Sequence, residues 1–342
     1  MSAKSSKYAL APKYSARAIA ESKQSANIKN INSKKNEPIA TVISAAEDAY
    51  IPPPPEPKIT PAYVNPSSYQ LHGNVDNIDE RNRHNPLAAP EYAQDMFIHF
   101  KEQERSTSVR PQYLSMQPQV DETMRAVLVD WLVNVQVQFE LAPESLHLAV
   151  NLVDRYLQKA EVIRTKLQLL GVAALFVAAK YEEVWTPRIS DFVSVCDNLY
   201  SRQEIVHMER DILNKLQYKI SVPTAYTFLV RYLQAGHSDT FIAQLSCYIL
   251  DGTLLSYPLL QYLPSQLAAA AVLIARNSTH RNPWSPTLLR YSQYYEEEIL
   301  PIARDILDKK SRINANLLAV NAKYSTKRFG RVAVQGAFLS CE

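Results

Sequence analysis

The sequence predicts an all-α protein: two related helical bundles in tandem, preceded by a short N-terminal helix and a disordered tail. The stretch Leu167–Tyr181, LQLLGVAALFVAAKY, is apolar on every side of a helical wheel, which is typical of a central, buried helix. A similar stretch, QLAAAAVLIAR, follows at Gln266–Arg276 and indicates a second bundle. Six glycines in 342 residues are few for a protein rich in β-hairpins.

The composition limits the class of protein. A length of 342 residues fits two domains and a tail, and a net charge of +3 does not imply a polyanionic partner. Cys196, Cys247 and Cys341 are scattered and odd in number, which disfavours a disulfide framework or a zinc site. No signal peptide or membrane-spanning run is evident. We therefore expect a soluble intracellular protein.

The first segment, residues 1–88, is rich in Ser, Ala, Lys and Asn, and we expect it to be disordered. It contains the run IPPPPEP at Ile51–Pro57. Such a run can be a stiff spacer or a polyproline ligand for an aromatic groove, and the sequence leaves both interpretations open.

The first bundle is predicted over residues 89–221, including the leading helix. In that helix Tyr92, Met96, His99 and Phe100 recur at helical spacing, and the chain before Pro111 should end it. Asp121 is a candidate N-cap for the next helix, which begins ETMRAVLVDWLV.

That next helix has two apolar stripes on opposite sides. The first consists of Met124, Val127, Leu128, Trp131 and Val135, and the second of Ala126, Val129, Val133 and Val137. One stripe must face the core. The other either lies against a second layer or forms an exposed docking surface, and the residue pattern does not decide between the two.

Three further helices are predicted in the first bundle, one before the central helix and two after it. A helix should open at Pro143, a residue suited to the first helical turn, and shorter ones should span about 189–196 and 201–216. Ser201 and Glu204 have the spacing of a capping box. Arg125 and Asp154 are charged residues in apolar helices, so we expect them to form a structural ion pair.

An internal repeat supports a second bundle over residues 222–326, with a C-terminal tail over residues 327–342. Leu148–Asp154 aligns with Leu245–Asp251, and Ala178 aligns with Ala275 at the same offset of 97 residues. Later helices are expected within residues 284–311 and 314–324. The second copy has no evident counterpart of the Arg125 helix, so the first bundle is the predicted active module.

Catalytic and cofactor motifs are missing from the sequence. The seven histidines form no HExxH pair, and neither a GxxxxGK[ST] phosphate loop nor a GxGxxG dinucleotide motif is present. We therefore expect a protein without catalytic residues, metal or cofactor.

Four segments together are similar to the cyclin box of eukaryotic cyclins: MRAVLVDWLV, LHLAVNLVDRYL, KLQLLGVAALFVAAKYEE and MERDILNKLQY. The resemblance covers about residues 90–324 and both bundles. It is strongest to the mitotic A/B group. VRPQYL at residues 109–114, KYEEVWTP and PTAYTFLVRYL favour the B type, whereas Arg164 and Gln168 are as in A-type cyclins.

This resemblance implies two tandem five-helix cyclin boxes and a non-catalytic activator of a cyclin-dependent kinase at the G2/M transition, located in the nucleus and cytoplasm. The partners implied are the kinase catalytic subunit and substrates or inhibitors with an Arg-x-Leu motif. The resemblance implies no binding to nucleic acid or to a membrane. In the family, the box turns a mobile, glutamate-bearing kinase helix inward and completes a Lys–Glu ion pair.

The resemblance also assigns roles to residues. Arg125 and Asp154 would form the internal ion pair. The kinase-binding residues would be Tyr92, Met96, His99, Lys180, Tyr181, Glu209 and Tyr218. The substrate-docking groove would contain Met124, Val127, Leu128, Trp131, Arg164 and Gln168, which places the first stripe outward. Asn134 stands where A-type cyclins carry Glu, which would weaken recognition of a basic docking residue.

Three alternative functions are compatible with a pair of cyclin-like bundles. An S-phase cyclin of the A type and a transcription-associated cyclin belong to the same functional class. A nucleic-acid-binding factor with two cyclin boxes is the alternative from another class. The absence of any cysteine before Cys196, where such a factor has a zinc ribbon, and the near-neutral charge disfavour it.

Overall fold

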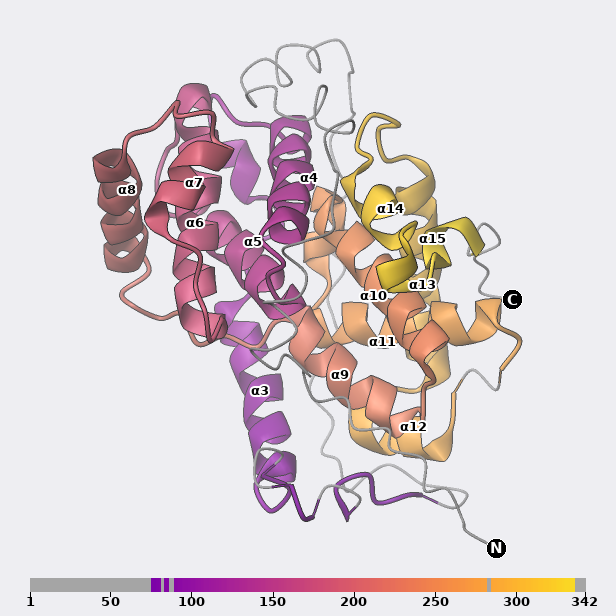
Figure 1. Cartoon of the computed structure of the whole chain (residues 1–342). Coiled ribbons are helices and arrows are strands. Elements are labelled where there is room, and N and C mark those ends of the chain that lie inside the picture. Colours follow the sequence, from indigo (N-terminus) through magenta and orange to yellow (C-terminus); the bar gives the residue numbers. More distant parts are fainter. Residues whose placement is uncertain (1–74, 81–82, 86–88, 282–283, 336–342) are drawn as a thin grey trace, which may run out of the picture. The chain divides into compact units, whose positions relative to one another are not determined.

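The computed structural model describes residues 75–80, 83–85, 89–281 and 284–335 (Figure 1). Within these ranges every regular element is a helix. The proline run at residues 51–57, Cys341 and most of the predicted tail lie outside the described residues.

The first bundle consists of five α-helices around a buried central one. They are α4 (Glu122–Gln138), α5 (Pro143–Leu157), α6 (Leu167–Glu182), α7 (Ile189–Val195) and α8 (Arg202–Lys215). Helix α6 packs against the other four, and all its residues from Leu167 to Ala179 are buried. Gly171 allows this packing, because a Cβ atom there would lie 2.6 Å from Leu128 Cδ1. The 3₁₀ turns η5 (Tyr113–Met116) and η6 (Arg164–Lys166) precede α4 and α6.

The predicted helix starts of this bundle are confirmed at two caps. The Asp121 side chain accepts a hydrogen bond from the Met124 N–H at 2.8 Å. Ser201 and Glu204 form the expected capping box. These caps fix where α4 and α8 begin, because each satisfies an amide that the helix itself leaves without an acceptor.

The second bundle repeats this arrangement with α9 (Ala225–Ala235), α10 (Thr240–Leu254), α11 (Pro264–Ser278), α12 (Pro286–Ser292) and α13 (Glu296–Ser311). Helix α11 takes the central position of α6, and its residues from Leu267 to Asn277 are buried. The 3₁₀ turn η7 (Tyr257–Gln261) precedes it, as η6 precedes α6. The predicted pair of tandem five-helix bundles is therefore present.

Ordered structure continues past the predicted end of the second bundle. It includes α14 (Ala319–Tyr324), the 3₁₀ turn η8 (Lys327–Phe329) and α15 (Val332–Gln335). The Phe329 ring lies 5.1 Å from the Tyr324 ring, and Val332 is fully buried. The predicted tail boundary at residue 327 is thus too early, because a few apolar residues in short turns give no periodic signal.

The predicted disordered tail also ends too late. In the described segment 75–80, Ile78 is buried and Asp79 forms an ion pair with Arg231 of α9. The leading helix α3 (Ala93–Thr107) follows this segment (Figure 1). A polar segment with one apolar residue resembles disordered sequence, which explains the error.

Candidate functional site

A buried ion pair connects the first two helices of the first bundle. Arg125 of α4 donates from Nε and Nη2 to the two carboxylate oxygens of Asp154 of α5, both at 2.7 Å. The Tyr113 hydroxyl donates to Asp154 Oδ1 at 2.6 Å, and Arg125 Nη1 donates to the Leu254 carbonyl at 2.8 Å. Burial alone would lower the pKa of Arg125, but the Asp154 charge outweighs it and raises this pKa. The pair therefore stays charged and links α4, α5 and α10.

The residues assigned to kinase binding are accessible. Tyr92, Met96 and His99 are exposed on α3, and Lys180, Tyr181 and Tyr218 are exposed on the first bundle. Helices α6 and α8 bring Lys180 and Glu209 together, and their side chains form a salt bridge. The exposed fractions of these two side chains are 40% and 16%.

Lys180, Tyr181 and Tyr218 are each held by local structure. The Lys180 ammonium lies 4.2 Å from the centroid of the Phe176 ring, a cation–π distance. The Tyr181 hydroxyl forms a hydrogen bond with Ser221 Oγ. Tyr218 has a φ of 57° at the turn after α8, which directs the chain away from the helix.

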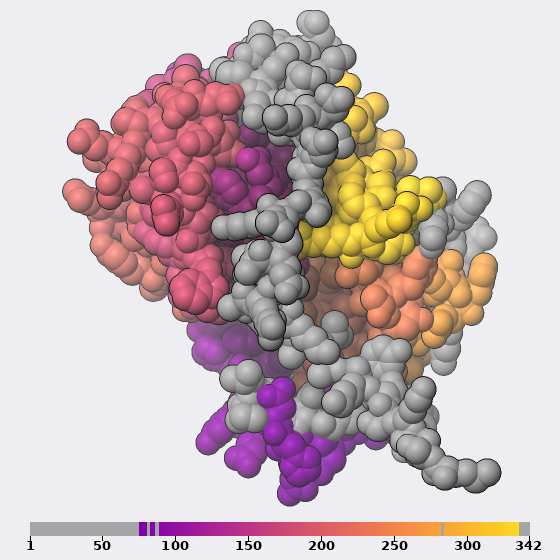
Figure 2. Space-filling view, viewed as in Figure 1, coloured from indigo at the N-terminus to yellow at the C-terminus, as the bar shows by residue number. Residues whose placement is uncertain are grey.

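Two further residues beside this surface were missed from the sequence. Val184 and Trp185 are 88% and 81% exposed, directly after the end of α6. Figure 2 shows the rose-coloured surface of this part of the first bundle. From the sequence, this segment, KYEEVWTP, was interpreted only as a mark of the B type. Two large apolar residues in such a segment were the available signal, because exposed side chains of this kind often mark an interface.

The predicted docking groove is only partly supported by the exposure of its residues. Val127 and Leu128 are buried, as is Val135 of the same stripe, so the prediction that the stripe faces outward is wrong for these three. Gln168 is also buried. The second stripe is buried at Val129 and Val133 too.

The cause is that α4 is covered by several neighbours. Leu128 lies directly over Gly171 of α6. Helix α14 of the C-terminal region also packs on α4, and the Ala319 N–H donates to Asp130 Oδ1 at 2.9 Å. A wheel diagram of α4 alone cannot show this second cover, so it overstated the free surface.

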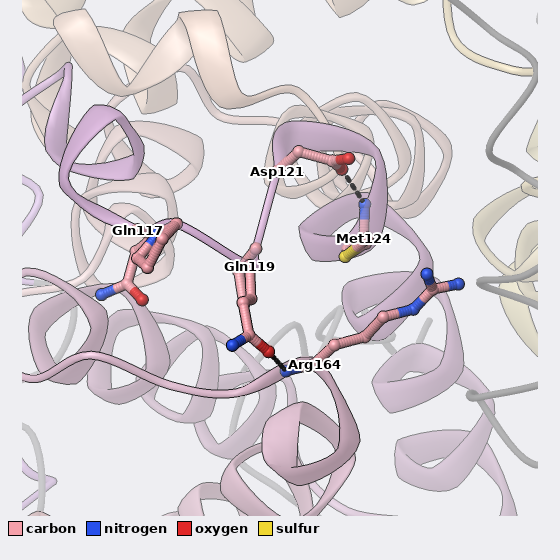
Figure 3. Close-up of a pocket in the computed structure, with 7 residues that line it drawn as sticks. Gln117, Gln119, Asp121, Met124 and Arg164 are labelled. Atoms are coloured by element: carbon pink, nitrogen blue, oxygen red, sulfur yellow. Dashed lines mark hydrogen bonds between the residues drawn. The ribbon is translucent and has the colours of Figure 1, made fainter.

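Two of the remaining groove residues border a cavity of about 350 Å³ (Figure 3). Met124 and Arg164 line it together with residues 117–121. Gln119 Oε1 accepts from the Arg164 N–H at 3.4 Å, which joins the two walls of the cavity. Trp131 is half-buried and packs on the core. The accessible part of the groove is therefore Met124, Arg164 and an edge of Trp131.

The second bundle has its own buried carboxylate, Asp251. It accepts from Lys323 Nζ at 2.7 Å and from the Tyr324 hydroxyl at 2.9 Å, and it contacts His147 Nε2 at 3.1 Å. Burial raises the pKa of Asp251, but Lys323 and His147 outweigh it and hold this pKa well below its usual range. The cation comes from Lys323 of α14 rather than from the first helix of the bundle, which explains why no counterpart of Arg125 is evident in the sequence.

Across the described ranges, no group of three or more His, Cys, Asp or Glu side chains is arranged to hold a metal ion. None of the described helices has the length and apolar character needed to cross a membrane.

Comparisons with known proteins give consistent matches. Residues 95–221 match the family model "Cyclin, N-terminal domain", and residues 223–336 match "Cyclin, C-terminal domain". The chain is 44% identical over 258 residues to Cyclin-B2-1 of Oryza sativa subsp. japonica, an alignment that covers 75% of this chain and 61% of that protein. It is 38% identical to G2/mitotic-specific cyclin-1 of Medicago sativa subsp. varia, over 75% of this chain and 60% of that protein.

Among solved structures, the chain is similar to a viral cyclin from herpesvirus saimiri, with a TM-score of 0.59 and 20% identity. That match covers 66% of this chain and 98% of the viral one, and it supports the fold. The alignments span about three fifths of the length of the two plant relatives.

Proposed function

This chain belongs to the cyclin family, and on that premise we propose that it is a non-catalytic regulatory subunit that binds and activates a cyclin-dependent protein kinase. The name of the Medicago relative supports a role at the G2/M transition. The nucleus and cytoplasm are the compartments in which such a regulator would act.

The observation that carries the proposal is the accessible surface at the end of α6. It combines the Lys180–Glu209 salt bridge with exposed Tyr181, Val184 and Trp185. Large apolar and aromatic side chains beside a few fixed charges are typical of the centre of a protein interface. Lys180 uses one of its three ammonium donors on Glu209 and can offer the others to a partner.

A co-purification experiment tests the proposal. The tagged full-length chain is recovered from its own cells, and the bound proteins are identified by mass spectrometry. We expect a cyclin-dependent kinase with the wild type and much less of it with a Lys180→Ala, Glu209→Ala double variant. Arg281→Ala is the matched control, since Arg281 forms an exposed ion pair with Asp239 on the second bundle. Recovery of no such kinase with the wild type would refute the proposal.

We also propose that the cavity beside Met124 and Arg164 receives Arg-x-Leu motifs of substrates or inhibitors. The support is the accessible apolar Met124 next to the polar wall formed by residues 117–121. The Asp121 carboxylate on that wall has the charge that a basic docking residue requires.

The docking proposal predicts a selective loss of kcat/KM. A Met124→Ala, Arg164→Ala double variant should lower kcat/KM about tenfold for substrates that carry the motif, because losing a docking anchor typically costs about 1–2 kcal/mol. Short peptides that contain only the phosphorylation site should be unaffected. An equal fall for both kinds of substrate would show that these residues act on folding or on the kinase instead.

A further inference from the structure

The leading helix α3 has two faces with different surroundings. Tyr92, Met96 and His99, the residues assigned to kinase binding, are exposed. The opposite face contains Phe97 and Glu104, which are partly or fully buried. The contacts of this second face determine where α3 holds its exposed residues.

The first contact is built on Arg231 of α9 in the second bundle. Its guanidinium carbon lies 4.9 Å from the ring centroid of Phe97 and 4.8 Å from that of Tyr291. Both terminal nitrogens donate to the carboxylate of Asp79, one at 2.7 Å to Oδ2. The Arg231 side chain is only 6% exposed, and the Asp79 carboxylate is the counter-charge that compensates its burial. Arg231 thereby joins the segment before α3, the helix itself and the second bundle.

The second contact lies nearer the end of α3. Glu104 accepts from the Ser265 N–H at 2.9 Å and from Ser265 Oγ at 2.7 Å. Ser265 is in the first turn of α11, where the helix dipole favours a carboxylate. One turn earlier, the Lys101 ammonium lies 3.7 Å from the centroid of the Tyr294 ring. The polar and aromatic contacts of this face thus reach α9, α11 and the loop after α12.

We propose that Arg231, held by Asp79, is a positioning residue for kinase binding: it fixes α3 on the second bundle so that Tyr92, Met96 and His99 face the kinase together with the first-bundle surface. The inference rests on the proposed function for the identity of the partner. Arg231 itself lies on the opposite side of α3 from these residues and acts through Phe97. The second bundle therefore contributes to kinase binding by orienting the leading helix.

Hydrogen exchange in the free full-length chain tests the anchor without any kinase. In Asp79→Asn and Arg231→Met variants, the amides of α3 should exchange about tenfold faster. Side chains in direct contact are typically coupled by a free energy that corresponds to a factor of this size. The amides of α6 should exchange as in the wild type. Asp239→Asn, which breaks an exposed ion pair of the second bundle, is the control and should change neither helix. Unchanged exchange in α3, or equal acceleration in α6, would overturn the proposal.

A double-mutant cycle with the kinase tests the positioning role. Met96→Ala should weaken kinase binding clearly in the wild-type background and much less in the Asp79→Asn background, because the displaced helix no longer presents Met96. Lys180→Ala should weaken binding equally in both backgrounds. Equal losses for Met96→Ala in both backgrounds would overturn the inference. If the wild type binds no kinase, the proposed function fails instead, and the exchange experiment still decides whether the anchor exists.

Discussion

Replacing Asp154 by alanine should destabilise the first bundle strongly. The substitution removes the two charged hydrogen bonds that Arg125 donates to the carboxylate, and it leaves a guanidinium that is 1% exposed without its counter-charge. Removing one partner of a buried ion pair costs about 3–5 kcal/mol. The Tyr113 hydroxyl also loses its acceptor, so the upper part of that range applies.

For a protein of this size, each kcal/mol lowers Tm by about 2–4 °C, so a loss of about 4–5 kcal/mol should lower Tm by about 8–20 °C. Thermal melting followed by circular dichroism measures it. Arg281→Ala, which breaks the exposed pair of Arg281 with Asp239, is the matched control and should cost less than about 1 kcal/mol. An unchanged Tm for Asp154→Ala would refute the assignment of this pair as a structural one.

Three further predictions use other sites. Lys180→Ala with Glu209→Ala should weaken kinase binding by about 2–5 kcal/mol, as measured by titration calorimetry. The same double variant should lower the stability of the free chain by less than about 1 kcal/mol in thermal melting, because the pair is partly exposed. Leu128→Ala should cost about 2–5 kcal/mol of unfolding free energy in urea titrations, and a loss below about 1 kcal/mol would contradict its place in the core. Burial raises the pKa of Asp130 from 3.8 to about 6, so its charge lowers the stability of the wild type progressively as pH rises from about 4 to 6. Asp130→Asn should therefore gain Tm relative to the wild type across that window, and a pH-independent difference would contradict this.

The bundle fold could be predicted because its signals are local. A helix that is apolar on every side must be buried, and the match of Asp154 to Asp251 at a constant offset revealed the repeat. The caps at Asp121 and Ser201 depend on side chains and amides within four residues of each other in the sequence, so they too could be predicted.

The parts that could not be predicted depend on contacts between distant segments. The burial of Leu128 depends on its contact with Gly171 of α6, and the cover of α4 by α14 joins Asp130 to Ala319, 189 residues later in the sequence. The pairing of Asp79 with Arg231 likewise links a polar segment to a helix, over a sequence separation of 152 residues. No periodicity within one element reports such a contact.

The central claim, that this chain is a regulatory subunit of a protein kinase, is tested most directly by reconstitution. The purified full-length chain is mixed with a purified cyclin-dependent kinase catalytic subunit, MgATP and a short peptide substrate, and phosphate transfer is measured for each component alone and for the mixture. We expect no transfer by the chain alone and a large rise in the kinase's turnover when the chain is added, lost with Lys180→Ala and Glu209→Ala. Phosphate transfer by the chain alone, with contaminating kinase excluded, or no rise in turnover with any catalytic subunit of this class, would contradict the account.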